Sequence, residues 1–248
     1  MTLEQFFKEN KRVAIAFSGG VDSAYLLYAA IGSGADVKAY FVKSAFQPQF
    51  ELEDARKLAS QLGARMEVLE VDVLCKENIT VNPVDRCYHC KKVIFETIVG
   101  AATKDGYALL IDGTNASDDS ADRPGMKALT ELSVRSPLRE CGLTKGEIRR
   151  LSKEAGLFTW NKPAYACLAT RIPTGEEITA EKLRRTEAAE NFLTSMGFAD
   201  FRVRSRDSVA KIQVTEEDLP KIMENREAVF TELKRYYEEV TLDLEVRK

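Results

Sequence analysis

The stretch AFSGGVDSAYLL, residues 16–27, lies between a predicted strand, RVAIAF (12–17), and a predicted helix, DSAYLLYAAIGSG (22–34). Glycines let the backbone approach an anion, hydroxyls donate to its oxygens, and a helix N-terminus offers unpaired N–H groups. The stretch therefore predicts a pyrophosphate cradle made of Ser18, Gly19, Gly20, Val21, Asp22 and Ser23. The alternative is a Ser- or Asp-capped helix after a glycine turn.

The chain that follows alternates strand and helix patterns up to about residue 114. Predicted strands are VKAYFV (37–42), MEVLEVDV (66–73) and YALLIDGT (107–114), and predicted helices are FELEDARKLASQLG (50–63) and HCKKVIFETIVGAATKDG (89–106). This alternation predicts an α/β fold with a doubly wound parallel sheet, helices on both faces and ligands at the carboxyl ends of the strands.

After residue 175 the pattern changes. It predicts a charged helix (180–197), strands FRVRS (201–205) and VAKIQV (209–214), a helix near Glu216 to Tyr237, and a last strand VTLDLEV (240–246). The sequence thus predicts two domains: residues 1–175, which carry the phosphate loop, and a smaller α/β domain of residues 176–248.

Composition limits the class of protein. The chain has 248 residues, 44% of them hydrophobic, a formal net charge of −3, and no apolar run long enough for a membrane span or a secretory signal. We therefore expect a cytoplasmic protein with no membrane partner and no global attraction to nucleic acid. Its five cysteines form an odd set at irregular spacings, which favours metal binding or catalysis over disulfides.

The segment DRCYHCKK, residues 85–92, contains a CxxC pair, Cys87 and Cys90. The chain has no second CxxC, so this pair is half of a metal or redox motif. Zinc would need further ligands, and the only histidine, His89, sits awkwardly between the two cysteines. A redox CxxC, structural thiols and one edge of an iron–sulfur cluster are the other interpretations. Cys75 and Cys141 have no partner at motif spacing and are predicted to pack.

Arginines alternate in FRVRSRD, residues 201–207. In a strand, Arg202, Arg204 and Arg206 would point to one face. Guanidinium groups suit phosphate or carboxylates through paired hydrogen bonds, and the alternative is a solvated strand face.

These motifs resemble known families. SGGVDS after a first strand resembles the PP-loop ATP pyrophosphatases, which have a HUP-like fold. The stretch SPLRECGLTKGEIRRLSKEAGLFTWNKPAYACLATRIPTG (136–175) resembles the LarE family, sulfur transferases that mature the nickel-pincer nucleotide of lactate racemase. The likeness covers nearly the whole chain, including the RVR segment, and departs conservatively at Asn161, Thr170 and Thr174.

The resemblance implies an ATP- and Mg²⁺-dependent enzyme. It would adenylate a carboxylate of pyridinium-3,5-biscarboxylic acid mononucleotide, after which sulfur displaces AMP to give a thiocarboxylate. The loop IDGTNASDD (111–119) resembles a GTN segment that lies near the nucleotide in PP-loop enzymes, although an Asx-rich turn is the alternative. That loop contributes Gly113, Thr114, Asn115 and Asp118. The catalytic residues implied by the resemblance are Cys167, Arg202, Arg204 and Glu190.

The family has two ways of supplying sulfur. One sacrifices the cysteine that matches Cys167, and the other resembles a 4Fe-4S cluster on three cysteines that passes on an external sulfide. Because Cys87 and Cys90 are present, we expect the cluster form, with Cys87, Cys90 and Cys167 as ligands. The resemblance also implies a homo-oligomer and a sulfide or other sulfur donor as partner.

Three other interpretations remain at this stage. A PP-loop tRNA thiolase can use a similar three-cysteine cluster, but it would need a large basic surface. A redox-sensing regulatory module would bind ATP without turnover. An ammonia-dependent synthetase would leave the cysteines unexplained.

Overall fold

The computed structural model describes residues 1–118 and 124–247, and the chain forms two compact units. Unit 1 contains Met1–Val73 and Asp85–Ala164, and unit 2 contains Leu74–Val84 and Tyr165–Lys248. The chain therefore passes from unit 1 to unit 2 and back, and it enters unit 2 a second time at Tyr165. The predicted domain boundary near residue 175 stays a prediction. In the described part of the chain, no helix has both the length and the apolarity that a membrane span requires.

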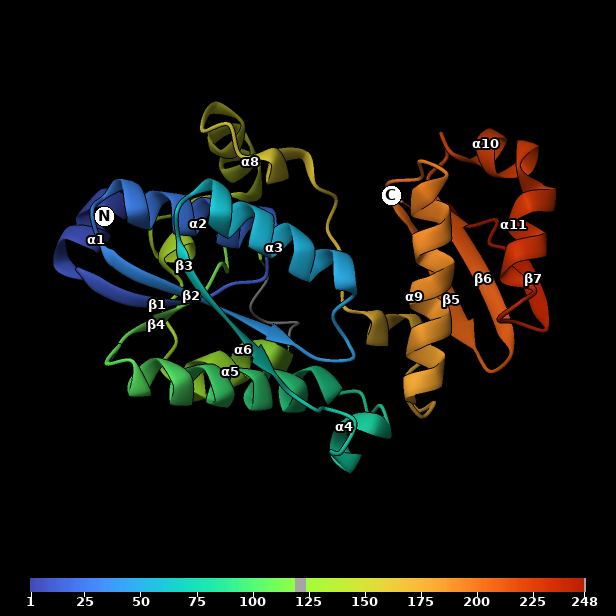
Figure 1. Cartoon of the computed structure of the whole chain (residues 1–248), viewed down its shortest axis with the longest axis horizontal. Helices are drawn as coiled ribbons and strands as arrows, with labels where there is room; N and C mark the ends of the chain where they lie inside the picture. Colours follow the sequence, from blue (N-terminus) through green and yellow to red (C-terminus); the bar gives the residue numbers. More distant parts are fainter. Residues whose placement is uncertain (119–123, 248) are drawn as a thin grey trace. The chain divides into compact units, whose positions relative to one another are not determined.

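Unit 1 is built on a parallel sheet of four strands in the order β3-β2-β1-β4 (Figure 1). The strands are β1 (Arg12–Ala16), β2 (Asp36–Lys43), β3 (Arg65–Glu70) and β4 (Leu110–Ile111). The helices are α1 (Leu3–Glu9), α2 (Val21–Gly32), α3 (Gln49–Gln61), α5 (Arg86–Lys104), α6 (Pro124–Glu131), α7 (Pro137–Glu140) and α8 (Lys145–Glu154), followed by the 3₁₀ turn η1 (Phe158–Asn161).

Helices cover both faces of this sheet, as the sequence predicted. Val13 and Ile15 of β1 pack in one apolar cluster with α2, α3 and α8, whereas Ala14 between them packs in another with α5 and α6. Side chains alternate across a strand, so a strand that is apolar at successive positions must be covered on both sides. Figure 1 shows α2 and α3 on one side of the sheet and α5 and α6 on the other. The doubly wound architecture is confirmed.

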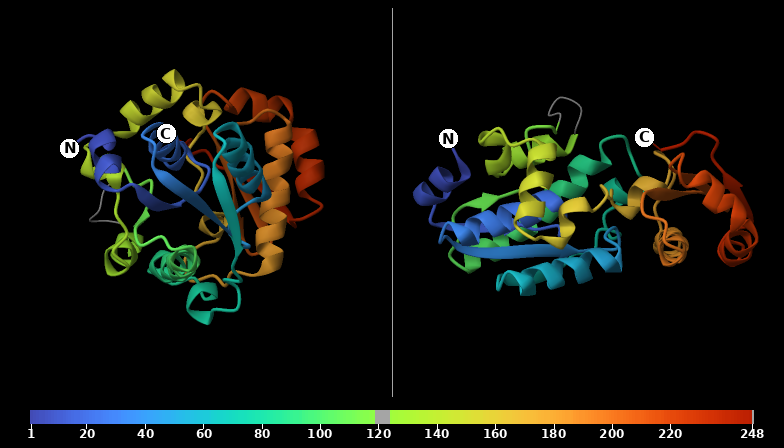
Figure 2. Two further views of the ribbon diagram at one scale, coloured as in Figure 1. Left: turned by 60° about the vertical axis from the view of Figure 1, so that its left-hand side comes forward. Right: turned by 90° about the horizontal axis from the view of Figure 1, so that it is seen from above.

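Unit 2 contains a sheet of three strands in the order β5-β6-β7, with β5 and β6 antiparallel and β6 and β7 parallel. Its elements are α4 (Glu77–Thr80), η2 (Leu168–Arg171), α9 (Ala180–Ser195), β5 (Phe201–Arg206), β6 (Val209–Val214), α10 (Leu219–Glu224), α11 (Arg226–Leu233) and β7 (Glu239–Leu242). Phe201 and Val203 of β5 pack with Leu193 of α9 and Leu233 of α11, so both helices cover one face of this sheet (Figure 2).

The single helix predicted near Glu216 to Tyr237 is wrong: the structure has two helices there, α10 and α11. They meet at Asn225, which ends the first and begins the second. The Asn225 side chain donates to the carbonyl of Lys221 over 2.8 Å. Asparagine competes for backbone hydrogen bonds in this way, which favours a helix end.

Candidate functional site

The phosphate loop is held by its own hydroxyl groups. Ser18 Oγ lies 3.1 Å from Ser23 Oγ and accepts from the N–H of Gly20 over 3.3 Å, and Ser23 Oγ donates to the carbonyl of Gly20 over 3.2 Å. Gly20 is the N-cap of α2, so the alternative of a helix capped by a Ser or Asp side chain is not what the structure contains. The first-turn N–H groups of α2 stay available to an anion.

Gly19 is the position where this loop requires glycine. Its φ is +70°, and an added Cβ would lie 3.1 Å from the Cβ of Ala55 on α3. Both the positive φ and the close approach exclude a larger residue. The glycine turn therefore fixes the entry to α2 against the neighbouring helix.

The second predicted loop packs directly against the first. A Cβ added at Gly113 would lie 2.9 Å from the backbone nitrogen of Ser23. Asp112, only 6% exposed, accepts hydrogen bonds from Thr114 Oγ1 over 2.5 Å and from Ser136 Oγ over 2.6 Å. The loop that follows β4 is thus held rigidly against the first turn of α2. Because β1 and β4 are neighbours and β2 lies on the other side of β1, this is the point where a doubly wound sheet binds its ligands.

Three polar side chains from separate segments meet at this edge of the sheet. Asp22 of α2 accepts from Lys145 Nζ over 2.5 Å and from Asn115 Nδ2 over 3.4 Å. Burial raises the pKa of Asp22, the Lys145 ammonium partly offsets this shift, and the nearby charge of Asp118 adds to it. The negative charge of Asp118 disfavours the charged form of Asp22, and a cation between the two would relieve this repulsion, so both side chains fit a Mg²⁺ neighbourhood.

Lys145 comes from a well-defined helix start. Thr144 caps α8 through a capping box with Glu147, and the backbone N–H of Lys145 donates to Ser117 Oγ over 3.0 Å. Sequence reasoning missed this lysine as a site residue, although it belongs to the GLTK segment quoted for the family resemblance. Its ammonium beside the phosphate loop is suited to a phosphate oxygen.

The CxxC pair opens α5, the long helix that packs under the sheet. Cys87 is exposed and Cys90 is 9% exposed, and residues three apart lie on the same side of a helix. Arg86 Nη2 lies 3.5 Å from Cys87 Sγ, and His89 Nε2 lies 3.2 Å from the carboxylate of Asp85 one turn earlier.

The thiols of this pair fit one edge of a metal or cluster site. Within residues 1–118 and 124–247, no group of three or more His, Cys, Asp and Glu side chains is arranged to hold a metal ion. Cys167, the third predicted ligand, belongs to unit 2. The three-cysteine ligand set stays a prediction.

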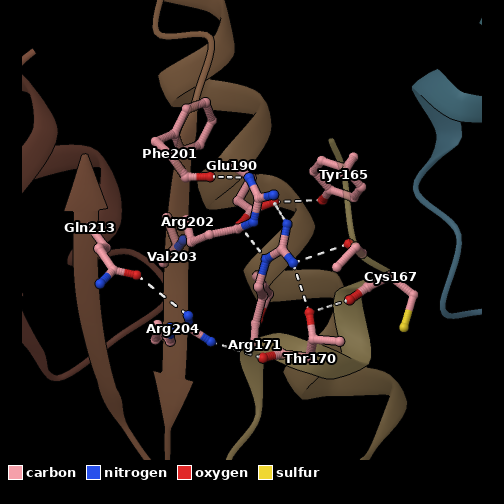
Figure 3. A network of polar contacts seen from close by, with 12 residues as sticks. Tyr165, Cys167, Thr170, Arg171, Glu190, Phe201, Arg202, Val203, Arg204 and Gln213 are labelled. Carbon is pink, nitrogen blue, oxygen red and sulfur yellow. Dashed lines mark hydrogen bonds and ion pairs between the residues drawn. The ribbon is translucent and has the colours of Figure 1, made fainter. Parts of the chain in front are cut away.

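Unit 2 contains a buried ion pair, Arg171 with Glu190. The Glu190 carboxylate accepts from Arg171 Nε over 2.7 Å and Nη2 over 3.1 Å, and also from Tyr165 Oη over 2.5 Å and the N–H of Val203 over 3.0 Å (Figure 3). Arg171 is 1% exposed and Glu190 3%. These hydrogen bonds satisfy the buried Glu190 carboxylate, and they join η2, α9 and the edge strand β5.

Two further arginines of β5 lie near this pair. Burial, together with the positive charges of Arg171 and Arg247, lowers the pKa of Arg202 to about 10. The same causes lower the pKa of Arg204, whose Nη1 donates to the carbonyl of Thr170 over 3.2 Å. Since cations that repel one another are stabilised by an added anion, this cluster is suited to a phosphate or carboxylate. The predicted row is uneven, because Arg202 is 7% exposed whereas Arg204 and Arg206 are exposed.

Cys167 is the N-cap of η2, the short turn that ends at Arg171. Its carbonyl accepts from the N–H of Thr170 over 3.0 Å and from Thr170 Oγ1 over 2.8 Å, and Arg171 Nη1 lies 2.8 Å from that Oγ1. Figure 3 shows the Cys167 sulfur pointing away from the arginines. The buried ion pair thus holds the backbone turn that presents this cysteine.

The structure therefore sorts the predicted residues into two sets. The phosphate loop and the residues Gly113, Thr114, Asn115 and Asp118 lie together in unit 1. Glu190, Arg202 and Arg204 lie together in unit 2 with Arg171 and Tyr165, which the sequence reasoning did not select. The sequence signal for Arg171 was its place in the TRIPTG segment, which was quoted for the family resemblance. An arginine that is buried on a turn requires an acidic partner.

Comparison with known proteins gives consistent likenesses. A family model described as queuosine biosynthesis protein QueC matches residues 12–84. The pyridinium-3,5-bisthiocarboxylic acid mononucleotide synthase of Lactiplantibacillus plantarum is 34% identical over 98% of this chain and 89% of its own length. An uncharacterized protein of Synechocystis is 40% identical over 98% of this chain and 92% of its own. A tRNA-specific 2-thiouridylase of Thermotoga petrophila is 26% identical over 61% of this chain and 54% of its own.

Proposed function

The chain belongs to the LarE family, and on that premise we propose that it is an ATP-dependent sulfur transferase that acts on a carboxylate of a pyridinium mononucleotide. The observation that carries the proposal is the phosphate loop with Lys145 beside it, in a chain that is similar over 98% of its length to a pyridinium-3,5-bisthiocarboxylic acid mononucleotide synthase. The acceptor proposed is pyridinium-3,5-biscarboxylic acid mononucleotide.

The first step is activation of the acceptor. A carboxylate oxygen attacks the α-phosphorus of ATP, and pyrophosphate leaves. Ser18 to Ser23 would bind the departing phosphates through hydroxyl and backbone N–H groups at the start of α2, with Lys145 as the cationic partner. Mg²⁺ would neutralise phosphate charge near Asp22 and Asp118.

The second step replaces oxygen by sulfur. A sulfur nucleophile adds to the acyl carbon and AMP leaves, so one carboxylate oxygen departs with AMP. Arg202 and Arg204 would bind the anionic groups of the mononucleotide, and Glu190 would hold Arg171 and the edge of β5 in place.

Three cysteines would hold the group that carries the sulfur. We propose that Cys87, Cys90 and Cys167 bind a 4Fe-4S cluster, a group that supplies an iron position open to an external sulfide. The exposed and buried thiols at the start of α5, with the Arg86 guanidinium 3.5 Å from Cys87 Sγ, support two of these ligands. If there is no cluster, Cys167 would give up its own sulfur.

A test of this proposal measures acceptor-dependent pyrophosphate release under anaerobic conditions. The protein is incubated with Mg²⁺-ATP, sulfide and either the biscarboxylic acid mononucleotide or bulk tRNA. Pyrophosphate and AMP formed in equal amounts, and only with the mononucleotide, are expected. Turnover only with tRNA would contradict the proposal.

Thiolation of tRNA is the second candidate, because the partial match to a tRNA-specific 2-thiouridylase favours it. That match covers 61% of this chain, and a net charge of −3 provides no strong attraction to a polyanion. The tRNA arm of the same assay separates the two candidates. We further propose that the protein works as a cytoplasmic homo-oligomer.

A further inference from the structure

Residues 158–162, which we call the strap, contact both α8 and α3 in unit 1. From α8, Arg149 donates to the carbonyl of Trp160 over 2.9 Å and to that of Lys162 over 2.8 Å. The N–H of Lys162 donates to the carbonyl of Thr159 over 3.0 Å. Both backbone polar groups of Lys162 are therefore bonded, and the backbone from which its side chain extends is fixed.

The Lys162 side chain reaches α3. Its Nζ lies 2.6 Å from a carboxylate oxygen of Asp54 and 5.2 Å from the centre of the Phe50 ring. The Lys162 side chain is 17% exposed and that of Asp54 is 31% exposed, so the pair is partly buried but still open to solvent. An anion that enters from solvent can therefore reach the ammonium and compete with Asp54 for it.

Asp54 belongs to the part of α3 that packs against the phosphate loop. A Cβ added at Gly19 would lie 3.2 Å from the backbone nitrogen of Ala55, an atom of the peptide group that joins Asp54 to Ala55. The Lys162 ammonium is bonded to the Asp54 side chain. It therefore lies about one side chain's length from the backbone of the loop.

Two lysine–aspartate pairs are thus neighbours of the phosphate loop. Lys145 pairs with Asp22 of α2, and Lys162 pairs with Asp54 of α3. In each pair, the carboxylate holds the ammonium near the loop, and the ammonium can exchange that carboxylate oxygen for a phosphate oxygen. Because a pyrophosphate group carries several negative charges, a second lysine at this site would neutralise charge that Lys145 alone leaves unbalanced.

We propose that Lys162 is a second phosphate-binding lysine of the nucleotide site, whose side chain exchanges Asp54 for a phosphate oxygen when the nucleotide binds. Arg149 is its positioning residue, because it fixes the backbone of the strap at Lys162. The inference rests on the proposed function and adds to it a cation that the sequence reasoning did not select.

The test measures binding of Mg²⁺-pyrophosphate by isothermal titration calorimetry, with no acceptor, sulfide or iron present. Lys162→Met removes the ammonium and keeps an apolar side chain, whereas Asp54→Asn is close to isosteric and removes the competing charge. Lys57→Met is the matched control. Lys57 also packs on the strap, with its Nζ 4.6 Å from the centre of the Phe158 ring, but it is exposed. All titrations are made well below the unfolding midpoint of each variant.

We expect Lys162→Met to bind pyrophosphate roughly 10- to 100-fold more weakly than the parent, because one charge-assisted hydrogen bond to the ligand is lost. Lys57→Met should bind as the parent does. Asp54→Asn should bind about two- to fivefold more tightly, since the ammonium no longer has to leave a carboxylate. This gain should vanish in the double variant with Lys162→Met.

A Lys162→Met variant that binds pyrophosphate as tightly as the parent would overturn the proposal. An Asp54→Asn variant that binds no more tightly than the parent, or whose gain survives in the double variant, would overturn it as well. If Lys162→Met does not fold, the Asp54→Asn result decides. The predicted variant effects in a protein that transfers no sulfur would reject sulfur transfer alone, whereas a parent that binds no pyrophosphate would overturn both proposals.

Discussion

Lys145 Nζ lies 2.5 Å from a carboxylate oxygen of Asp22, which joins the first turn of α8 to the first turn of α2 across 123 residues of sequence. The pair brings a cation to the start of the helix that follows the phosphate loop. A negatively charged phosphate entering this loop meets N–H groups, hydroxyls and the lysine together. The pair is therefore the feature of unit 1 that most favours nucleotide chemistry over a structural glycine turn.

Replacing Lys145 by methionine should weaken binding of ATP and of pyrophosphate by roughly 10- to 100-fold, since a hydrogen bond to a charged group contributes about 1.5–3 kcal/mol. Isothermal titration calorimetry measures the loss. Lys153→Met, at an exposed position of the same helix, is the control and should bind as the parent does. Equal affinities of the two variants for ATP would show that Lys145 does not bind the phosphates.

Gly113→Ala should destabilise the protein by about 1–3 kcal/mol and lower its affinity for ATP, because the added Cβ would press on the backbone at Ser23, 2.9 Å away. Gly146→Ala is a matched control in α8, where nothing lies within 4 Å of the added atom. That variant should be neutral or stabilising by up to about 1 kcal/mol. Urea unfolding measures both, and a stable Gly113→Ala that binds ATP normally would show that the two loops need not touch.

Arg202→Met should keep or raise the stability of the free protein and abolish binding of the mononucleotide. Burial and neighbouring arginines lower the pKa of Arg202 to about 10, so its charge opposes folding until an anion is bound. Thermal unfolding with and without nicotinic acid mononucleotide measures both effects. Arg206→Met, on the same strand but exposed, should still be stabilised by the ligand. Ligand stabilisation that survives in Arg202→Met would contradict the assignment.

Protein purified without oxygen should contain iron and acid-labile sulfide in near-stoichiometric amount per chain, and this content should collapse in Cys87→Ala. Three cysteine ligands are expected to hold the cluster, so loss of one removes most of it. Cys75→Ala, which removes another exposed cysteine, is the control and should keep its iron. A parent protein that contains no iron after anaerobic reconstitution would contradict the cluster. Two alternatives would then remain: Cys167 gives up its own sulfur, or the CxxC pair binds zinc.

Much of unit 1 could be predicted from sequence because its signals are local. Val13, Ala14 and Ile15 are apolar in succession, which indicates a strand covered on both faces, and the glycines after it mark the turn into α2. The predicted phosphate loop and the GTN loop meet because both follow strands that are neighbours in the sheet. In a doubly wound sheet, the loops that follow neighbouring strands lie at the same edge, so a correct fold prediction also predicts that these two loops lie close together.

The parts that sequence could not provide depend on contacts between distant residues. Lys145 reaches Asp22, and Asn82 reaches Pro173, through bonds that no local pattern encodes. The same is true of Arg171, whose partner Glu190 lies one helix further on. The helix break at Asn225 was missed although its cause is local. Asparagine occurs inside many helices, so the residue type alone does not predict a helix end. Here its side chain bonds to the carbonyl of Lys221 and ends the first helix.

The most direct test of the account is the mass of the acceptor and of the protein after one anaerobic incubation with Mg²⁺-ATP, sulfide and pyridinium-3,5-biscarboxylic acid mononucleotide. The account predicts an acceptor in which sulfur has replaced one oxygen, together with AMP, pyrophosphate and a polypeptide of unchanged mass. The Cys167→Ala variant should give no sulfur in the acceptor. An acceptor that stays a biscarboxylate while ATP is bound would contradict the central claim.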